Sequence, residues 1–254
     1  MQTILFSSIK GGVGKSSLAI LLSNFLAAAG KRVLCIDLDI QNSLTFYSID
    51  DFDQIEEKNA SLALHTGNLK NHIVATKNPL IHLLPSSLGL IDLRAMSERK
   101  LRTLLPQVSD DYDFCIIDSA PTYDNIVLNA VHAADKIVTP ARLSLFDLKS
   151  AQFYLDKLTT ETDSIAKWNL LFNFYTPPRT DNPDAIARQY EDQFKNYFGD
   201  HVMNSKIPGT RLLQNAVDLN ESVSTAKAKL NLFDSVKMLA QELTGLNFDS
   251  VEKF

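Results

Sequence analysis

A glycine-rich segment, SIKGGVGKSS at residues 8–17, joins two apolar stretches near the start of the chain. Glycines let successive backbone N–H groups turn inward around a polyphosphate, and the start of a following helix adds the positive end of its dipole. Lys15 is spaced to reach the β- and γ-phosphates of a nucleotide, and Ser16 is spaced to ligate Mg²⁺. We therefore expect a strand, a phosphate-binding loop and a helix. The expected nucleotide contacts are Lys10, Gly11, Gly12, Val13, Gly14, Lys15, Ser16 and Ser17.

Apolar, strand-like runs recur along the chain with helix-like segments between them, an alternation typical of a parallel α/β sheet. Residues 33–36 and 114–117 are apolar at successive positions, so helices should cover both faces of these strands. The sequence therefore predicts a doubly wound α/β fold with a mostly parallel sheet and helices on both faces. The expected strands are Thr3–Ile9, Arg32–Asp37, Ile81–Pro85, Phe114–Asp118, Lys136–Pro140 and Leu170–Tyr175, with later helices near Ala185–Tyr197 and Phe233–Leu243.

Composition favours one globular domain, residues 1–254, in the cytoplasm. The chain is 45% hydrophobic and contains no Pro/Gly/Ser-rich linker, repeat or low-complexity segment that would divide it. Its N-terminus lacks the charged region and cleavage site of a secretion signal, and its longest apolar run, Leu18–Ala29, is too short to span a bilayer. Cys35 and Cys115 lie inside expected strands, so we interpret them as buried hydrophobes in a reducing compartment.

Carboxylates stand at the ends of two expected strands. Asp37 and Asp39 alternate along one strand end, which places both on the same face, directed toward the loop, where they would organise a cation or a water molecule. Asp118 ends the apolar run at residues 114–117, an arrangement in which a strand-end aspartate holds Mg²⁺. The expected metal-side residues are Ser16, Asp39 and Asp118.

The loop departs from the common G-x-x-x-x-G-K-[ST] pattern, because Ile9 occupies the position of the first glycine. Lys10 follows it, which gives the form K-G-G-x-G-K-S. This form resembles the deviant Walker A motif of the ParA/MinD family, and later motifs extend the resemblance over nearly the whole chain. The resemblance implies a P-loop NTPase fold, ATP as the nucleotide, and a Lys10 that crosses a dimer interface to the partner's nucleotide.

Residues 37–43 resemble the family's switch segment, D-x-D-P-Q-G-N, whose second aspartate positions or activates the attacking water. Asp39 matches that aspartate. Ile40 replaces the usual proline and Asn42 the usual glycine, so the motif does not fix the loop conformation or the hydrolysis rate. The catalytic roles implied by the resemblance fall on Lys10, Lys15 and Asp39.

Two late segments add binding roles by the same resemblance. Asn173 matches an asparagine that reads the adenine edge, and Pro208 lies in a segment that packs on the base. Arg211 matches an arginine that contributes to DNA binding, while Lys227 and Lys229 could extend a phosphate-neutralising edge that reads no bases. Lys206 is a further candidate, and a solvated basic surface is the alternative interpretation of these lysines.

The resemblance implies a slow, Mg²⁺-dependent ATPase that dimerises on ATP, binds non-specific DNA on the nucleoid and drives plasmid or chromosome partition with a ParB-like centromere-binding stimulator. A net charge of −5 argues against constant DNA coating but leaves room for a local basic patch. A MinD-like membrane-associated ATPase and a metabolic P-loop enzyme remain as alternatives. Residues 245–254 carry two acids and one lysine, which suits an anionic membrane poorly.

Overall fold

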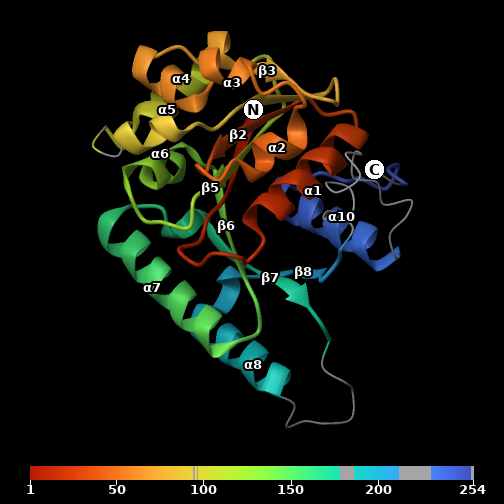
Figure 1. Ribbon diagram of the computed structural model, residues 1–254. Helices are drawn as coiled ribbons and strands as arrows, with labels where there is room; N and C mark the ends of the chain where they lie inside the picture. The colour runs from red at the N-terminus through yellow and green to blue at the C-terminus, as the bar shows by residue number, and fades with distance from the viewer. Residues whose placement is uncertain (94, 96, 178–185, 212–229, 253–254) are drawn as a thin grey trace.

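The computed structural model describes residues 1–93, 95, 97–177, 186–211 and 230–252, and one twisted sheet forms its centre (Figure 1). Eight strands pair in the order β3-β4-β2-β5-β1-β6-β7-β8. All neighbours are parallel except the antiparallel pair β3 and β4. The predicted α/β class with a mostly parallel sheet is confirmed. The strands are β1 (Gln2–Phe6), β2 (Val33–Leu38), β3 (Val74–Ala75), β4 (Ile81–Leu84), β5 (Phe114–Ser119), β6 (Lys136–Ala141), β7 (Trp168–Tyr175) and β8 (Val202–Pro208).

Helices cover both faces of the sheet, and the side-chain alternation of the central strand explains why. On β1, Leu5 packs into one apolar cluster with residues of α4 to α8, while Ile4 and Phe6 pack into a second cluster with α1 and α10. Both faces therefore gain stability from apolar burial. The longer helices are α1 (Lys15–Ala28), α4 (Ala60–Thr66), α6 (Asn125–Ala133), α7 (Leu145–Glu161), α8 (Ile186–Phe198) and α10 (Leu230–Thr244), and the shorter ones are α2 (Ser43–Ser48), α3 (Gln54–Glu57) and α5 (Lys100–Leu104).

The six predicted strands all form, with ends that differ from prediction by up to three residues, and two further strands were missed. β3 is only two residues long, which is too short to give a periodic signal. β8 lies at the sheet edge beside β7, and its buried positions alternate with exposed polar ones such as Asn204. This period-2 pattern indicates a strand, but residues 206–211 were interpreted only as a motif, so the strand was not predicted.

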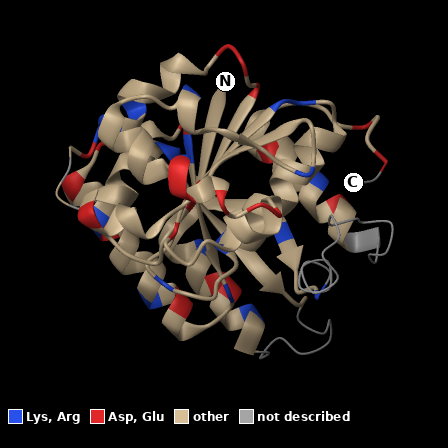
Figure 2. Cartoon of the chain, turned by 45° about the horizontal axis from the view of Figure 1, so that its top comes forward, with Lys and Arg blue, Asp and Glu red and all other residues tan. Residues whose placement is uncertain are grey.

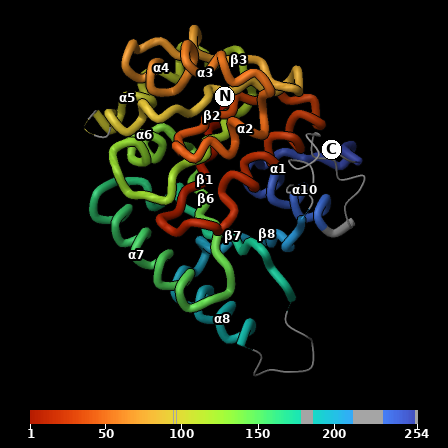
Figure 3. Tube along the Cα trace, viewed as in Figure 1, coloured from red at the N-terminus to blue at the C-terminus, as the bar shows by residue number. Residues whose placement is uncertain are grey.

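The arrangement leaves a crevice above the carboxyl ends of the central strands. α1 follows β1 on one face of the sheet, whereas α6 follows β5 on the opposite face, so the chain leaves two neighbouring strands in opposite directions. Ligands of open α/β sheets bind at such switch points. The loop between β1 and α1 lies at this edge, near the ends of β6 and β7 (Figure 3).

Candidate nucleotide site

The phosphate-binding loop takes the backbone form that its glycines allow. Gly12 and Gly14 have φ angles of +71° and +93°, and α1 begins directly after Gly14. A Cβ on Gly14 would also lie 2.3 Å from Nδ2 of Asn173, so this position excludes any side chain for two reasons. The first turn of α1 contains no acidic residue, which leaves the positive end of its dipole free for an anion.

A cavity of about 710 Å³ opens over this loop, large enough for a nucleotide. Its walls come from the loop, the start of α1, the segment that follows β2, and the ends of β7 and β8. Most predicted loop contacts line it, whereas Val13 is buried beneath the loop. The lining residues are Gly11, Gly12, Gly14, Lys15, Ser16, Ser17, Ile20, Asp39, Gln41, Ser43, Phe46, Tyr47, Pro121, Phe174 and Thr210.

Lys15 lines this cavity, and the fully buried Asp118 lies close enough for its charge to act on Lys15. Burial lowers the pKa of Lys15, and the charges of Asp118 and Asp39 only partly oppose that effect. Burial and the neighbouring Asp37 raise the pKa of Asp118 well above its usual range. Burial therefore disfavours the charged forms of both groups, and an anion beside Lys15 or a cation beside Asp118 would offset that cost.

The donor set around Asp118 fits Mg²⁺. Both carboxylate oxygens of Asp118 are buried without a hydrogen-bond partner among the described residues, although the Ser16 hydroxyl lies near enough to lower the pKa of this carboxyl. Among the described residues, no group of three His, Cys, Asp or Glu side chains gathers to hold a metal. Mg²⁺ rarely uses such a cage, because it keeps waters and binds through one or two carboxylates plus phosphate oxygens. Ser16 and Asp118 would hold the ion on the protein side.

Asp37 and Asp39 have different partners despite their spacing. Asp37 accepts hydrogen bonds from the backbone N–H groups of Asp39 and Thr45, at 3.0 and 2.9 Å, and from the Thr45 hydroxyl at 2.8 Å. Burial raises the pKa of Asp37 to about 6, even though these hydrogen bonds oppose the shift. Asp37 thus anchors the start of α2. Asp39 lines the cavity, and the hydrogen bond that its carboxylate accepts within the described part of the chain is a local one, from the Gln41 N–H at 3.0 Å.

The switch segment tolerates its departures from the family pattern. Asn42 has a φ of +57°, in the left-handed region where glycine is the usual residue and asparagine is the common substitute. Its side-chain amide donates to the carbonyl of Ile40 at 3.1 Å, which holds the turn. Asparagine therefore suits the left-handed backbone of this turn.

Lys10 does not line its own cavity. Its ammonium group forms an ion pair with Asp147 at the start of α7, and about a third of the lysine side chain remains exposed. Asp147 is buried and is held further by the Ser144 hydroxyl and by the backbone N–H of Arg142. Lys15 therefore faces the cavity, whereas Lys10 of the same loop contacts Asp147 at the start of α7.

The late predicted residues fall into three groups. Asn173 is buried at the end of β7 and donates through Nδ2 to the carbonyl of Val13 at 2.7 Å, so it braces the loop. Pro208 ends β8 without lining the cavity, and Arg211 is exposed just beyond it. The other two predicted DNA contacts, Lys227 and Lys229, lie outside the described residues.

Lys206 occupies an ion-pair cluster and not an open basic surface. It bonds to the carboxylate of Glu191 on α8 and to the hydroxyl of Tyr175, and Lys195 approaches the same carboxylate at 2.7 Å. Burial would raise the pKa of Glu191, but the hydrogen bonds from Lys195, Lys206 and Tyr175 outweigh it and lower this pKa to about 2. Lys206 therefore holds α8 against β8 and is a poor phosphate contact.

Among the side chains beside the loop that sequence reasoning missed are Arg142, Asp147 and Phe174. Asp147 follows Ser144 by three residues, and the Ser144 hydroxyl accepts from the Asp147 N–H, so a capping-box search would have found the helix start, although not the contact with Lys10. Phe174 carries no recognisable motif. Its place in the cavity depends on how β7 pairs with β8, which is a tertiary property.

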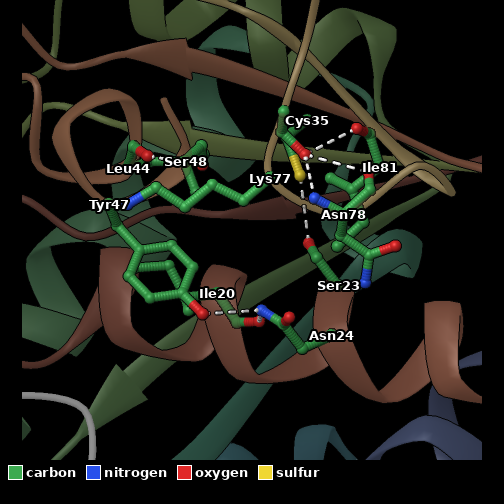
Figure 4. A pocket seen from close by; sticks show the side chains of 11 residues that line it. Ile20, Ser23, Asn24, Cys35, Leu44, Tyr47, Ser48, Lys77, Asn78 and Ile81 are labelled. Carbon is green, nitrogen blue, oxygen red and sulfur yellow. Dashed lines mark hydrogen bonds between the residues drawn. The ribbon is translucent and has the colours of Figure 1, made fainter. Parts of the chain in front are cut away.

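A second cavity of about 20 Å³ lies behind the first and has room for about one water molecule (Figure 4). Ser23, Asn24 and Cys35 contribute to its walls, and the Cys35 thiol lies 3.1 Å from the Ser23 hydroxyl. Both predicted buried cysteines are indeed buried and free. Ile20 on α1 and Tyr47 on α2 line both cavities.

No described helix is long and apolar enough to cross a membrane.

Residues 1–168, more than half of the chain, match the family described as the AAA domain. The chromosome-partitioning ATPase Soj of Treponema pallidum is 27% identical over 252 residues, which cover 95% of this chain and 96% of Soj.

Two solved structures show the same fold. A plasmid partition protein from Borrelia burgdorferi has a TM-score of 0.67 at 22% identity, covering 86% of this chain and 97% of its own. Cobyrinic acid a,c-diamide synthase from Mycobacterium smegmatis, with a bound ATP analogue and magnesium, has a TM-score of 0.74 at 20% identity and covers 98% of both chains. From its matched residues and its full-length likeness to Soj, the chain belongs to the AAA-domain family and is a P-loop ATPase of the ParA/MinD type.

Proposed function

We propose that this protein is a ParA-like ATPase that dimerises on ATP, binds DNA non-specifically and hydrolyses ATP slowly to drive plasmid or chromosome partition. The observation that carries the proposal is the placement of Lys10. A partly exposed loop lysine that lies outside its own cavity, with its ammonium group on Asp147, is suited to reach a second nucleotide, presented by a second copy of the chain, once that ion pair opens.

The proposed cycle assigns a separate task to each side chain. Lys15 and the loop N–H groups bind the triphosphate, and Ser16 and Asp118 hold Mg²⁺, which would offset phosphate charge. Asp39 accepts a local backbone hydrogen bond and lies at the cavity wall, where it would align the attacking water. Because dimer formation needs the γ-phosphate, hydrolysis returns the protein to monomers.

The proposed dimer binds DNA through phosphate neutralisation. Arg211 supports this step because it is exposed at the end of β8, beside the cavity-lining Thr210. Lysines and arginines are interspersed with acids over the view of the chain in Figure 2. A monomer with a net charge of −5 would hold DNA weakly, and bringing two copies of Arg211 together in a dimer would make binding depend on ATP. The proposed setting is the cytoplasm, with a ParB-like stimulator as the partner.

The alternatives differ in what the ATP-bound protein binds. A metabolic enzyme shares this fold at a similar TM-score, so the fold alone does not separate the two functions. The MinD-like alternative requires a membrane-binding segment.

Electrophoretic shift assays with ATP and with ADP, alongside flotation on anionic liposomes, test the output. We expect ATP-dependent DNA binding that is indifferent to sequence and falls steeply with added salt. Arg211→Glu should lose DNA binding but keep ATP binding, whereas the matched control Arg102→Glu, an exposed arginine on α5, should behave like the parent protein. Liposome binding without DNA binding would overturn the proposal in favour of the MinD-like function.

A further inference from the structure

Phe174 has a backbone conformation that aromatic residues rarely adopt. Its φ is +53°, and Asn42 is the only other described non-glycine residue with a positive φ. The pairing of β7 with β8 explains the distortion. Asn173 pairs with Ile207 and Tyr175 pairs with Pro208, so Phe174 is the extra residue of a β-bulge. Bulges redirect a side chain out of the regular sheet alternation, and they are common next to binding sites.

The redirected ring reaches the phosphate-binding loop. A Cβ built on Gly14 would lie 3.3 and 3.4 Å from Cε2 and Cζ of Phe174, so one ring edge packs where only a glycine fits. The guanidinium of Arg142 lies over the ring, 4.5 Å from its centroid, and also bonds to the carbonyl of Gly12. The loop, a cation and the bulge thus hold the ring in place.

One part of the ring remains open to the cavity. Phe174 is 39% exposed and lines the 710 Å³ cavity together with Thr210 and the loop. Arg142 occupies one face of the ring and Gly14 one edge, so the surface that remains is available to a flat ligand. An exposed aromatic ring fixed beside a phosphate-binding loop has the features of a stacking platform.

We propose that Phe174 is the stacking surface for the base of the bound nucleotide, and that the bulge exists to present it. This inference rests on the proposed nucleotide binding and adds a residue to it. Every base has a π-face, so the ring supplies affinity for the base without selecting its identity. Arg142 lies over one face of the ring and bonds to the Gly12 carbonyl, so it holds the ring beside the loop.

The test separates base binding from phosphate binding. Isothermal titration calorimetry measures the affinities of the parent protein, Phe174→Gly, Phe174→Leu and Phe174→Tyr for ATP and for inorganic triphosphate. We expect Phe174→Gly and Phe174→Leu to weaken ATP about tenfold and to leave triphosphate unchanged, since stacking on one aromatic ring is lost. Phe174→Tyr should retain the parent affinity for both ligands.

A stability measurement shows whether a loss of affinity comes from damage to the fold. Because glycine adopts a positive φ without cost, Phe174→Gly should melt without ligand at a temperature no lower than Phe174→Leu, which keeps the disfavoured conformation. Equal weakening of ATP and triphosphate, or ATP affinity in Phe174→Leu equal to that of the parent protein, would overturn the stacking role. If the parent protein binds neither ligand, the proposed nucleotide function itself fails.

Discussion

The charges of the nucleotide cavity and the charges between α8 and β8 are arranged in opposite ways. At the nucleotide site, burial lowers the pKa of Lys15, which lines the cavity, and raises that of the fully buried Asp118, so the charged form of each group is less favourable than in water. Between α8 and β8, the pKa of Glu191 is lowered to about 2 and that of Lys206 is raised, because the two groups satisfy each other. The nucleotide site is therefore suited to a charged ligand, whereas the ion pairs between α8 and β8 stabilise the fold.

The largest expected effect is the loss of ATP binding in Lys15→Ala. This change removes the nearest fixed cation to the β- and γ-phosphates, so affinity for ATP should fall at least about a hundredfold. The melting temperature without nucleotide should not fall, since a buried cation is removed. Calorimetry provides the affinity, and Lys157→Ala, which alters a surface i,i+4 pair on α7, is the matched control. An affinity within a few-fold of the parent would mean that the cavity is not a phosphate site.

Asp39→Ala should separate hydrolysis from binding in the same region. The carboxylate is assigned to the attacking water and not to the phosphates, so hydrolysis should fall by roughly a hundredfold while ATP affinity stays within a few-fold. ATP-bound dimers should then accumulate, as sedimentation would show. Hydrolysis at the parental rate would remove Asp39 from the mechanism.

The ion pair of Lys10 and Asp147 combines features of both regions. The two charges neutralise each other in the monomer, as between α8 and β8, but the pair must open if Lys10 is to reach a second nucleotide. Lys10→Ala should keep ATP binding within a few-fold and fail to dimerise. Asp147→Asn keeps a side-chain oxygen able to accept from the Arg142 N–H yet removes the charge, so dimers should form at several-fold lower ATP concentration. Normal dimerisation by Lys10→Ala would show that this lysine has no role across the interface.

The smallest effect should come from Glu191→Gln, and it should appear in stability alone. The folded pKa of Glu191, about 2, lies below the ordinary value near 4.5. Its ion pairs therefore contribute fully at neutral pH, and the contribution is lost as the pH falls from about 4.5 toward 2. Melting temperatures at pH 7 and pH 3 should differ less for the variant than for the parent, while ATP affinity is unchanged. If the melting temperature of the variant falls between pH 7 and pH 3 by as much as that of the parent, groups other than Glu191 cause the sensitivity to acid.

Sequence patterns predicted the parts of the site that depend on local chemistry. The loop at residues 8–17, the strand-end acids and six of the strands are each set by residues adjacent in the chain, so motif and period revealed them. The contact of Lys10 with Asp147 joins residues 137 apart, and the placement of Phe174 depends on a bulge between two strands. Such features arise from strand pairing and helix docking, which a single sequence does not encode in any short pattern.

Two acids of one short motif show the same limit at closer range. Asp37 and Asp39 are two residues apart, so the sequence predicts that both face the loop. In the structure Asp37 accepts hydrogen bonds from Thr45, whereas Asp39 lines the cavity. Thr45 lies on α2, and its position follows from the left-handed turn at Asn42. The motif therefore identified both acids, but only the packing of α2 shows that they have different surroundings.

Sedimentation velocity of the parent protein with Mg²⁺ and either ATP or ADP tests the central claim most directly. We expect a dimer with ATP and a monomer with ADP, because Lys10 is proposed to reach the γ-phosphate of the nucleotide bound by a second copy. A protein that binds ATP by calorimetry yet sediments as a monomer with both nucleotides would contradict it.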